Sequence, residues 1–216
     1  MLHELLGLRP SSPALLGYIS GLSETSVKHE VKAYPDAVYY NYHALGLSLL
    51  FSPTSGYKPK SGASEKDLDL ERLSLTGIDV YNVLLTDATQ TKDSRKIINA
   101  SFSTFPSFPL ETLIPDDGGA TEKSATQTGS QPSPSSRNLS ITPETIGKEF
   151  VEALGEPARK GGGSGPSSGS IGIWCEWPKA GLMVEFGGNE ARGPQAWERG
   201  KDAHWSVISI FERSTS

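Results

Sequence analysis

Two stretches of the chain alternate between apolar and polar residues with the two-residue period that is typical of β-strands. The first covers 38–51 (VYYNYHALGLSLLF) and the second covers 171–186 (IGIWCEWPKAGLMVEF). Each stretch is interrupted near its middle by a short turn-forming segment that ends in a Gly-Leu pair. The pattern therefore predicts two antiparallel hairpins, each with one buried face.

The two predicted hairpins align with each other without gaps. When 38–51 is written under 173–186, Gly46-Leu47 falls on Gly181-Leu182 and Phe51 falls on Phe186. Leu49 then corresponds to Val184, and both stand in the second arm of a hairpin between apolar neighbours at two-residue spacing. We expect both side chains to be buried at equivalent positions.

A helix is predicted before each hairpin and a further strand after it. Ser12-Pro13 and Thr142-Pro143 have the composition of helix starts, and apolar residues follow both at helical spacing. The later strands are expected at 77–82 and 204–211. Helix, hairpin and strand thus occur twice in the same order. The sequence predicts an α+β fold of two repeated helix–hairpin–strand units with antiparallel sheet, leaving open whether the units share one sheet.

Residues 115–140 contain almost no apolar side chains. Such a segment cannot offset its ordering entropy by burial, so we expect a disordered linker. The predicted organisation is a first αβββ-like unit at 1–114, the linker at 115–140, and a second unit at 141–216. Within the first unit, 97–114 is expected to be a strand or an extended packed segment.

Composition restricts the class of protein. A net charge of −5 disfavours a nucleic-acid partner, and no apolar run has the length of a membrane helix. A single cysteine excludes an internal disulfide. The first residues, MLHELLGLRPSSP, lack the apolar core of a signal peptide. We expect a cytoplasmic protein, with the nucleus as an open alternative.

No stretch of the sequence matches a catalytic, cofactor or metal motif. The glycines from 161 follow a predicted helix and precede a strand, whereas a phosphate-binding loop precedes a helix. The four histidines lie far apart and lack ligand spacing. Cys175 falls on the predicted inner face, which favours a buried small hydrophobe over a nucleophile. We therefore expect no cofactor and no metal site, and favour a protein that is not an enzyme.

The segment 190–205 (EARGPQAWERGKDAHW) is the best candidate for a binding site. All four tryptophans of the chain lie between 174 and 205, and Trp and Arg are enriched at the energetic centres of protein interfaces. The alternative is that Trp197 folds back over the sheet edge or the other unit. The predicted partner-binding residues are Arg192, Trp197, Arg199, His204 and Trp205.

The segments ITPETIGKEFVEALGEP and WPKAGLMVEF carry a resemblance to known proteins. They are similar to the small helix-plus-sheet units of beta-lactamase inhibitor proteins and of outer-membrane assembly lipoproteins of the SmpA/OmlA type. The whole chain also resembles a group of fungal proteins. In the inhibitor proteins such units occur in tandem, so the resemblance implies a tandem fold. It does not imply either bacterial role, because this chain shows neither their export signal nor a lipid-bearing cysteine.

Two classes of function remain after the sequence has been read. The first is a non-enzymatic protein-binding or adaptor protein that holds a protein partner on the exposed sheet face and the 190–205 loop. The second is a small-molecule-binding protein or enzyme with a pocket between the two units. The first is favoured because no convergent catalytic set is visible.

Overall fold

The computed structural model describes residues 1–83, 102–114, 138–163 and 172–214. These residues form an α+β fold around one eight-stranded antiparallel sheet with the strand order β1-β2-β3-β4-β10-β9-β8-β7. A separate two-stranded ribbon pairs β5 with β6. The strands are β1 (Glu30–Ala33), β2 (Val38–Tyr42), β3 (Leu47–Pro53), β4 (Leu73–Tyr81), β5 (Leu110–Leu113), β6 (Asn138–Ile141), β7 (Arg159–Gly161), β8 (Trp174–Trp177), β9 (Leu182–Phe186) and β10 (Trp205–Phe211), and the α-helices are α1 (Pro13–Gly21), α3 (Gly147–Leu154) and α4 (Ala196–Arg199).

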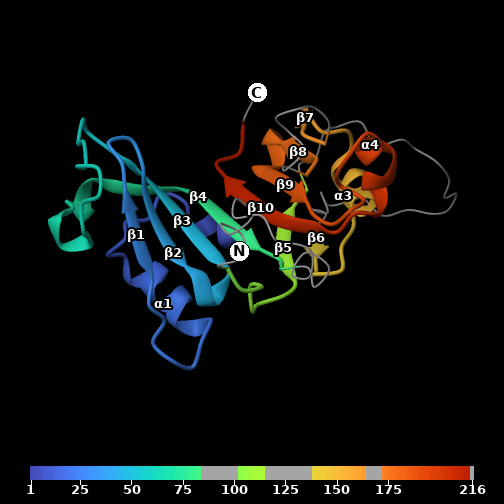
Figure 1. The fold of residues 1–216 in the computed structure, drawn as a ribbon. Helices are drawn as coiled ribbons and strands as arrows, with labels where there is room; N and C mark the ends of the chain where they lie inside the picture. The colour runs from blue at the N-terminus through green and yellow to red at the C-terminus, as the bar shows by residue number, and fades with distance from the viewer. Residues whose placement is uncertain (84–101, 115–137, 164–171, 215–216) are drawn as a thin grey trace, which may run out of the picture.

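The sheet is continuous because β4 and β10 pair along its centre. Ile78 lies opposite Ile210, and Val80 lies opposite Ile208. Strands β1–β4 form the N-terminal half of the sheet and β7–β10 form the C-terminal half (Figure 1). The question of one sheet or two is thereby answered: both predicted hairpins belong to one sheet.

One face of the sheet, here called the core face, carries the hydrophobic core. Helix α1 contributes Leu15 and Ile19 to it, and α3 contributes Phe150, whose ring contacts Trp177 and Phe186. The predicted burial of Leu49 and Val184 is confirmed, with exposed fractions of 1% and 0%. Cys175 is buried as well, as its place in the alternating pattern predicted.

The β5–β6 ribbon lies between α1 and α3 in Figure 1 and packs on the core face. Leu110 and Ile141 are buried in the core, and Phe108 contacts Trp205. The side-chain amide of Asn82 donates to the carbonyl oxygens of Pro143 and Trp205. This amide therefore ties the end of β4 to the chain that follows the ribbon.

The helix prediction is right for α1 and shifted for α3. Pro13 is the first residue of α1, as expected. In the C-terminal half the helix begins at Gly147, four residues after Pro143, which was predicted to be its first residue behind a Thr142 cap. The side chain of Thr145 accepts from the amide of Thr142, and this turn occupies the position of the predicted first helical turn. The amide of Ile146 donates to Glu149, which begins the helix there.

Three short strands were not predicted. β1 lies in a polar segment, β7 lies in the glycine-rich connection, and β6 includes residues 138–140 of the predicted linker. The disordered-linker prediction is therefore wrong for 138–140, which pair with β5. The rest of that prediction, 115–137, lies outside the described residues, as does 97–101 of the predicted extended segment. Nowhere in the described ranges is there a helix of the length and apolar character needed to cross a membrane.

Candidate functional site

The second face of the sheet, here called the open face, is not covered by α1, α3 or α4, the α-helices of the described residues, since these pack on the core face. Period-two alternation places the polar and aromatic residues of both halves on it. Most of these side chains are half-buried rather than fully exposed. The open-face residues are Tyr39, Asn41, Ser48, Leu50, Asp79, Tyr81, Val207, Ser209, Phe211, Met183, Glu185, Trp174 and Glu176.

The strand register produces one row of neighbours across all eight strands of the open face. Neighbouring side chains within the row interact at three places. Ser48 donates to Asn41 at 2.8 Å, Ser209 donates to Asp79 at 2.6 Å, and Arg159 forms an ion pair with Glu176 at 3.2 Å. From β1 to β7 the row consists of Glu30, Asn41, Ser48, Asp79, Ser209, Met183, Glu176 and Arg159.

The N-terminal half of the open face is hollowed into a groove of about 690 Å³, here called the polar groove. Strands β1 to β4 supply most of its lining, and one aromatic ring comes from the segment after residue 101. Acidic, basic and aromatic side chains are mixed in this lining. The lining residues are Glu30, Lys32, Tyr34, Asp36, Ala37, Tyr39, Asn41, His43, Ser48, Asp79, Tyr81 and Phe102.

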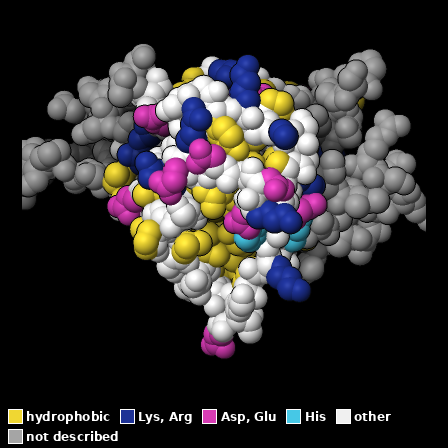
Figure 2. Space-filling view, turned by 90° about the vertical axis from the view of Figure 1, so that its left-hand side faces the viewer, with side chains coloured by type: hydrophobic (Ala, Val, Ile, Leu, Met, Phe, Trp, Pro, Cys, Tyr) yellow, Lys and Arg dark blue, Asp and Glu magenta, His cyan; other side chains and the backbone are white. Residues whose placement is uncertain are grey.

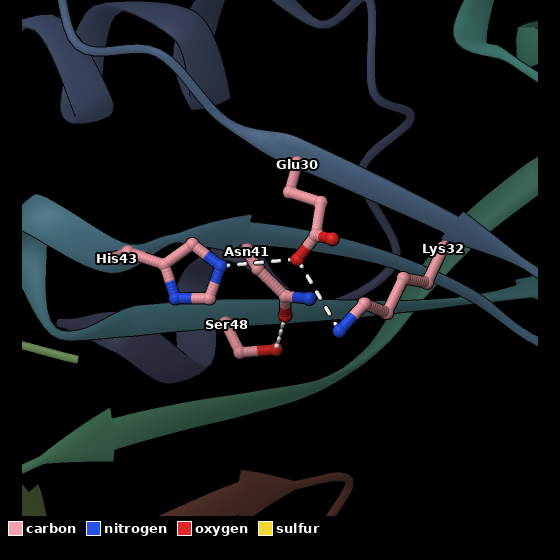
Figure 3. A network of polar contacts seen from close by, with 5 residues as sticks. All are labelled: Glu30, Lys32, Asn41, His43 and Ser48. Atoms are coloured by element: carbon pink, nitrogen blue, oxygen red, sulfur yellow. Dashed lines mark hydrogen bonds and ion pairs between the residues drawn. The ribbon is translucent and has the colours of Figure 1, made fainter. Parts of the chain in front are cut away.

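Glu30 is the centre of a charged network at the β1 end of the groove (Figure 3). Its carboxylate lies 3.1 Å from Nε2 of His43 and 3.3 Å from Nζ of Lys32. The hydrogen bond with His43 is the main cause that lowers the pKa of Glu30, and Lys32 adds to it. In Figure 2, which faces the side of the molecule where β1 lies, acidic, basic and histidine side chains gather beside hydrophobic ones. This end of the groove is therefore close to charge balance.

Asp79, near the centre of the sheet, has a different environment. Burial raises the pKa of its carboxyl group, and the hydroxyl of Ser209 is its only hydrogen-bond donor among the described residues. Burial also raises the pKa values of Tyr39 and Tyr81, and the negative charge of Asp79 adds to both shifts. The pKa of Glu185 is raised by burial as well, with a smaller contribution from Asp79. The centre of the open face thus holds two carboxyl groups whose pKa values burial raises, and the positive charge of Arg192 opposes that shift at Glu185.

Aromatic rings line the groove beside this negative charge. Tyr81 and Phe102 stack with their ring centres 3.9 Å apart, and Phe102 also lies 4.4 Å from His43. Tyr34 meets Tyr39 edge to face at 6.2 Å. Rings and carboxylates placed together form an environment that favours a cationic group, because the ring faces and the carboxylates both attract positive charge.

The groove contains a serine and a histidine, but they are not arranged as a nucleophile and its base. Ser48 donates its hydroxyl to Asn41, and His43 contacts Glu30, so the hydroxyl and the imidazole are not bonded to each other. Within the described ranges, no three His, Cys, Asp or Glu side chains are placed to hold a metal ion.

The five residues predicted to bind a partner do not share one surface. Trp205 is fully buried, and its indole donates to the carbonyl oxygen of Thr142 at 2.8 Å. A register shift between Trp205 and Val207 interrupts the pairing of β10 with β9 at this point. His204 is exposed, and its backbone forms an isolated antiparallel β-bridge with Ile146. Trp205 therefore belongs to the core and does not reach a surface.

The other three residues of that set lie together around α4. Trp197 is 41% exposed, and Nζ of Lys160 lies 5.8 Å from the centre of its ring. Arg199 donates to the carbonyl oxygens of Asn189 and Arg192, each at 3.0 Å. Arg199 thus holds the connection between β9 and α4 in shape, while Trp197 remains partly accessible beside the edge strand β7.

The groove residues were not singled out from the sequence. Tyr39, Asn41, Asp79 and Tyr81 stand at the polar positions of predicted strands, where side chains alternate away from the core. The period-two pattern assigned them to the outer face, but nothing in it brought Asp79 together with Ser209, 130 residues later. No family model, curated protein or solved structure matches the chain.

Proposed function

We propose that this protein is a non-enzymatic binding protein that holds a protein partner against the open face of its sheet. The observation that carries the proposal is the row across all eight strands, polar or charged at every strand except β9 with Met183, flanked by half-buried aromatic side chains and not covered by the helices of the described residues. Tyrosine, tryptophan and methionine are over-represented in protein interfaces, and Tyr39, Tyr81, Met183 and Trp174 all lie on this face.

The size of the open face is compatible with a specific complex. Eight strands spaced about 4.8 Å apart span roughly 30 Å. A standard protein interface buries about 800 Å² on each partner, which a face of this width can supply. The row is continuous across the β4–β10 pairing, so a partner could contact both halves of the sheet at once.

The charge of the face indicates the chemistry of the partner. Asp79 is a desolvated carboxylate with a neutral hydroxyl as its hydrogen-bond donor, and Asp36, at the rim of the groove, takes part in no salt bridge in the described structure. A lysine or arginine side chain placed between Tyr39 and Tyr81 would neutralise Asp79 and contact both rings. The proposed partner therefore presents a basic side chain at the centre of its contact surface.

Site-specific photo-crosslinking tests this proposal in cells that express the intact chain. The photoreactive residue p-benzoylphenylalanine is placed at position 39 or 183 on the open face, or at position 16 on the exposed side of α1 as the matched control. We expect the same protein adduct from positions 39 and 183 and none from position 16. Asp79→Asn should reduce the adduct yield at least several-fold, because it removes the charge that attracts the basic side chain.

Two outcomes would overturn the proposal. One is adducts from position 16 in equal yield, which would place the partner on the helical side. The other is the absence of any protein adduct from the two open-face positions in chains that are folded and abundant.

A small ligand in the polar groove is the second candidate function, favoured by the groove volume. A volume of 690 Å³ lies within the range of about 300–1,000 Å³ that is typical of small-molecule sites. In that case the photoreactive residue at position 183, outside the groove lining, would give no adduct, and a small cationic molecule would protect position 39 from reaction.

We also propose that the two halves of the sheet are copies of one unit. In both halves a helix precedes a hairpin whose turn is a short 3₁₀ segment, His43–Leu45 or Pro178–Ala180, ending in a left-handed glycine. In both, the last strand lies at the centre of the sheet. A duplicated unit that pairs through its last strand gives this arrangement directly.

A further inference from the structure

The floor of the polar groove is a short run of small polar side chains between two aromatic walls. Asn41 on β2, Ser48 on β3 and Asp79 on β4 are direct neighbours in the strand register. Tyr39 stands two residues before Asn41, and Tyr81 stands two residues after Asp79. Because β2 and β4 run in the same direction on either side of β3, the two tyrosines lie on opposite sides of this floor.

Each wall is supported by a second ring. Tyr34 meets Tyr39 edge to face with the ring centres 6.2 Å apart. Tyr81 stacks on Phe102 at 3.9 Å, and Phe102 in turn lies 4.4 Å from His43. Tyr39 and Tyr81 are half-buried, so part of each ring remains open to the groove that they line. The walls are therefore aromatic surfaces that neighbouring rings hold in place.

Asp79 places an open carboxylate oxygen at this floor. Its Oδ1 accepts the hydrogen bond of Ser209 at 2.6 Å. Its Oδ2 accepts no hydrogen bond from the described residues and is open to solvent at the groove. The neighbouring Ser48 gives its hydroxyl proton to Asn41 instead (Figure 3). A donor from a bound group would offset the cost of burying this carboxylate.

The charged side chains of the lining leave the floor negative. Glu30 and Lys32 pair with each other at 3.3 Å at the β1 end of the groove. Asp36 at the rim and Asp79 at the floor form no ion pair within the described part of the chain. The floor therefore combines a negative charge, an oxygen that lacks a donor, and two ring surfaces.

We propose that the polar groove binds an arginine side chain of the protein partner in preference to lysine, with the guanidinium group lying between Tyr39 and Tyr81 and donating to Oδ2 of Asp79. This inference rests on the proposed protein-binding function and specifies the residue that the partner presents. A guanidinium group is planar and weakly hydrated, so its faces can stack on rings while its edge donates to a carboxylate.

Two other cations match the floor less completely. A lysine ammonium group is compact and strongly hydrated, so it would lose hydration against the ring walls while only Oδ2 of Asp79 accepts from it. A trimethylated lysine suits aromatic walls, but it has no N–H group and would leave that oxygen without a donor. Arginine satisfies the rings and the carboxylate together.

NMR titration of the full chain, labelled with nitrogen-15, tests this preference. The probes are capped pentapeptides with two glycines on each side of a central arginine, lysine, trimethyl-lysine or citrulline. We expect the arginine peptide to shift the amide resonances of Ser48 and Asp79 saturably, and to bind about 5-fold more tightly than the lysine and trimethyl-lysine peptides. Citrulline keeps the shape of arginine without its charge and should bind about 10-fold more weakly.

Substitutions separate the contribution of the carboxylate from that of the ring. Asp79→Asn should weaken binding of the arginine peptide about 10-fold. Glu24→Gln removes an exposed charge outside the groove lining, so this matched control should change the affinity by less than about 2-fold. Tyr39→Leu should reduce the preference for arginine over lysine to less than about 2-fold, whereas Tyr39→Phe keeps the ring and should retain the preference.

Four results would overturn the inference. These are lysine or trimethyl-lysine peptides that bind as tightly as the arginine peptide, a citrulline peptide that does so, an unchanged arginine affinity in Asp79→Asn, or no saturable shift from any of the peptides. The two proposals fail separately. Protein adducts from positions 39 and 183 together with any of these results would leave the protein-binding function standing and overturn only the choice of arginine.

Discussion

Ser209 on β10 donates a hydrogen bond of 2.6 Å to Asp79 on β4, and the two residues are direct partners in the register that joins the halves of the sheet. The pair lies at the middle of the row across the open face, with three residues of the N-terminal half on one side of it and three of the C-terminal half on the other. The central pairing of the sheet therefore carries a desolvated carboxylate held by a neutral hydroxyl.

Asp79→Asn should stabilise the free protein at pH 7. The amide keeps an oxygen that can accept from Ser209 but carries no charge to desolvate. Because burial raises the pKa of Asp79 in the folded state, the folded chain holds this proton more tightly than the unfolded chain does. The contribution of Asp79 to stability is thus greatest below its ordinary pKa of 3.8 and is lost as the pH rises through the folded-state pKa.

Urea unfolding at several pH values between 4 and 7 measures this effect. The advantage of Asp79→Asn over the unmodified protein should grow with pH across that range. Asp36→Asn, on an exposed residue at the rim of the same groove, is the control and should change stability by less than about 0.5 kcal/mol. A less stable Asp79→Asn protein at pH 7 would contradict the account of this carboxylate.

Leu49→Ala and Val184→Ala should both destabilise the fold strongly. Each residue is almost completely buried between two neighbouring strands of its half of the sheet. We expect a loss of about 2–4 kcal/mol for Leu49 and about 1–3 kcal/mol for Val184 in chemical unfolding. Leu16→Ala, on a side chain that is 48% exposed, should cost less than about 1 kcal/mol. Equal effects at all three positions would argue against the described core.

Gly46→Ala and Gly181→Ala should destabilise more than Gly56→Ala. All three glycines have positive φ values, so the backbone cost of alanine is shared. A Cβ added at Gly46 would collide with the carbonyl oxygen of Ser103, and one added at Gly181 would collide with that of Phe211. At Gly56 the space is open. We expect about 1 kcal/mol for Gly56 and clearly larger losses for the other two. Thermal unfolding of the three variants separates the collision from the backbone cost.

Trp205→Ala and Trp197→Ala should differ by several kcal/mol in stability. Trp205 is fully buried, so Trp205→Ala should lower the free energy of unfolding by about 3–5 kcal/mol. Trp197 is 41% exposed, so Trp197→Ala should lower it by less than about 2 kcal/mol. The binding hypothesis for Trp197 can then be tested on a folded protein. It predicts that Trp197→Ala lowers the recovery of the partner found by cross-linking, and unchanged recovery would limit the interface to the open face.

Cys175 should react slowly with thiol reagents in the native protein. Burial raises its pKa to about 11 from a reference of 9.0, so its thiolate fraction near pH 7.5 is about 100-fold lower than that of an exposed thiol. Alkylation by iodoacetamide should therefore be at least that much slower in the folded than in the urea-unfolded chain. Rapid labelling of the folded protein would show that β8 opens readily.

The parts of the fold that were predictable from the sequence are those that depend on residues close together in the chain. Alternation located both hairpins and the buried positions of Leu49 and Val184, and Pro13 marked the start of α1. The short strands β1 and β7 carry few apolar residues, so their pairing depends on the neighbouring hairpin arm, which a local pattern does not contain. The later start of α3 follows from the hydrogen bonds of Thr145 and Glu149, which outweigh the composition at Pro143.

The candidate site was less predictable because strand register brings together residues that are far apart in the sequence. Asp79 and Ser209 are ordinary strand residues in the sequence and become neighbours through the β4–β10 pairing. The tryptophan-rich segment gave a stronger compositional signal, yet it combined the buried Trp205 with the accessible Trp197. Composition finds large aromatic residues, but only packing decides which of them meet solvent.

The sheet ends on two strands of four and three residues, β1 and β7. Strands this short expose few unpaired backbone amides and carbonyl groups along the sheet border. Glu30 and Lys32 add charge on one border, and Arg159 and Lys160 add charge on the other. These are the devices by which β-proteins resist stacking edge to edge into fibres. A chain with one broad continuous sheet can in this way remain dispersed at high concentration while its face stays available.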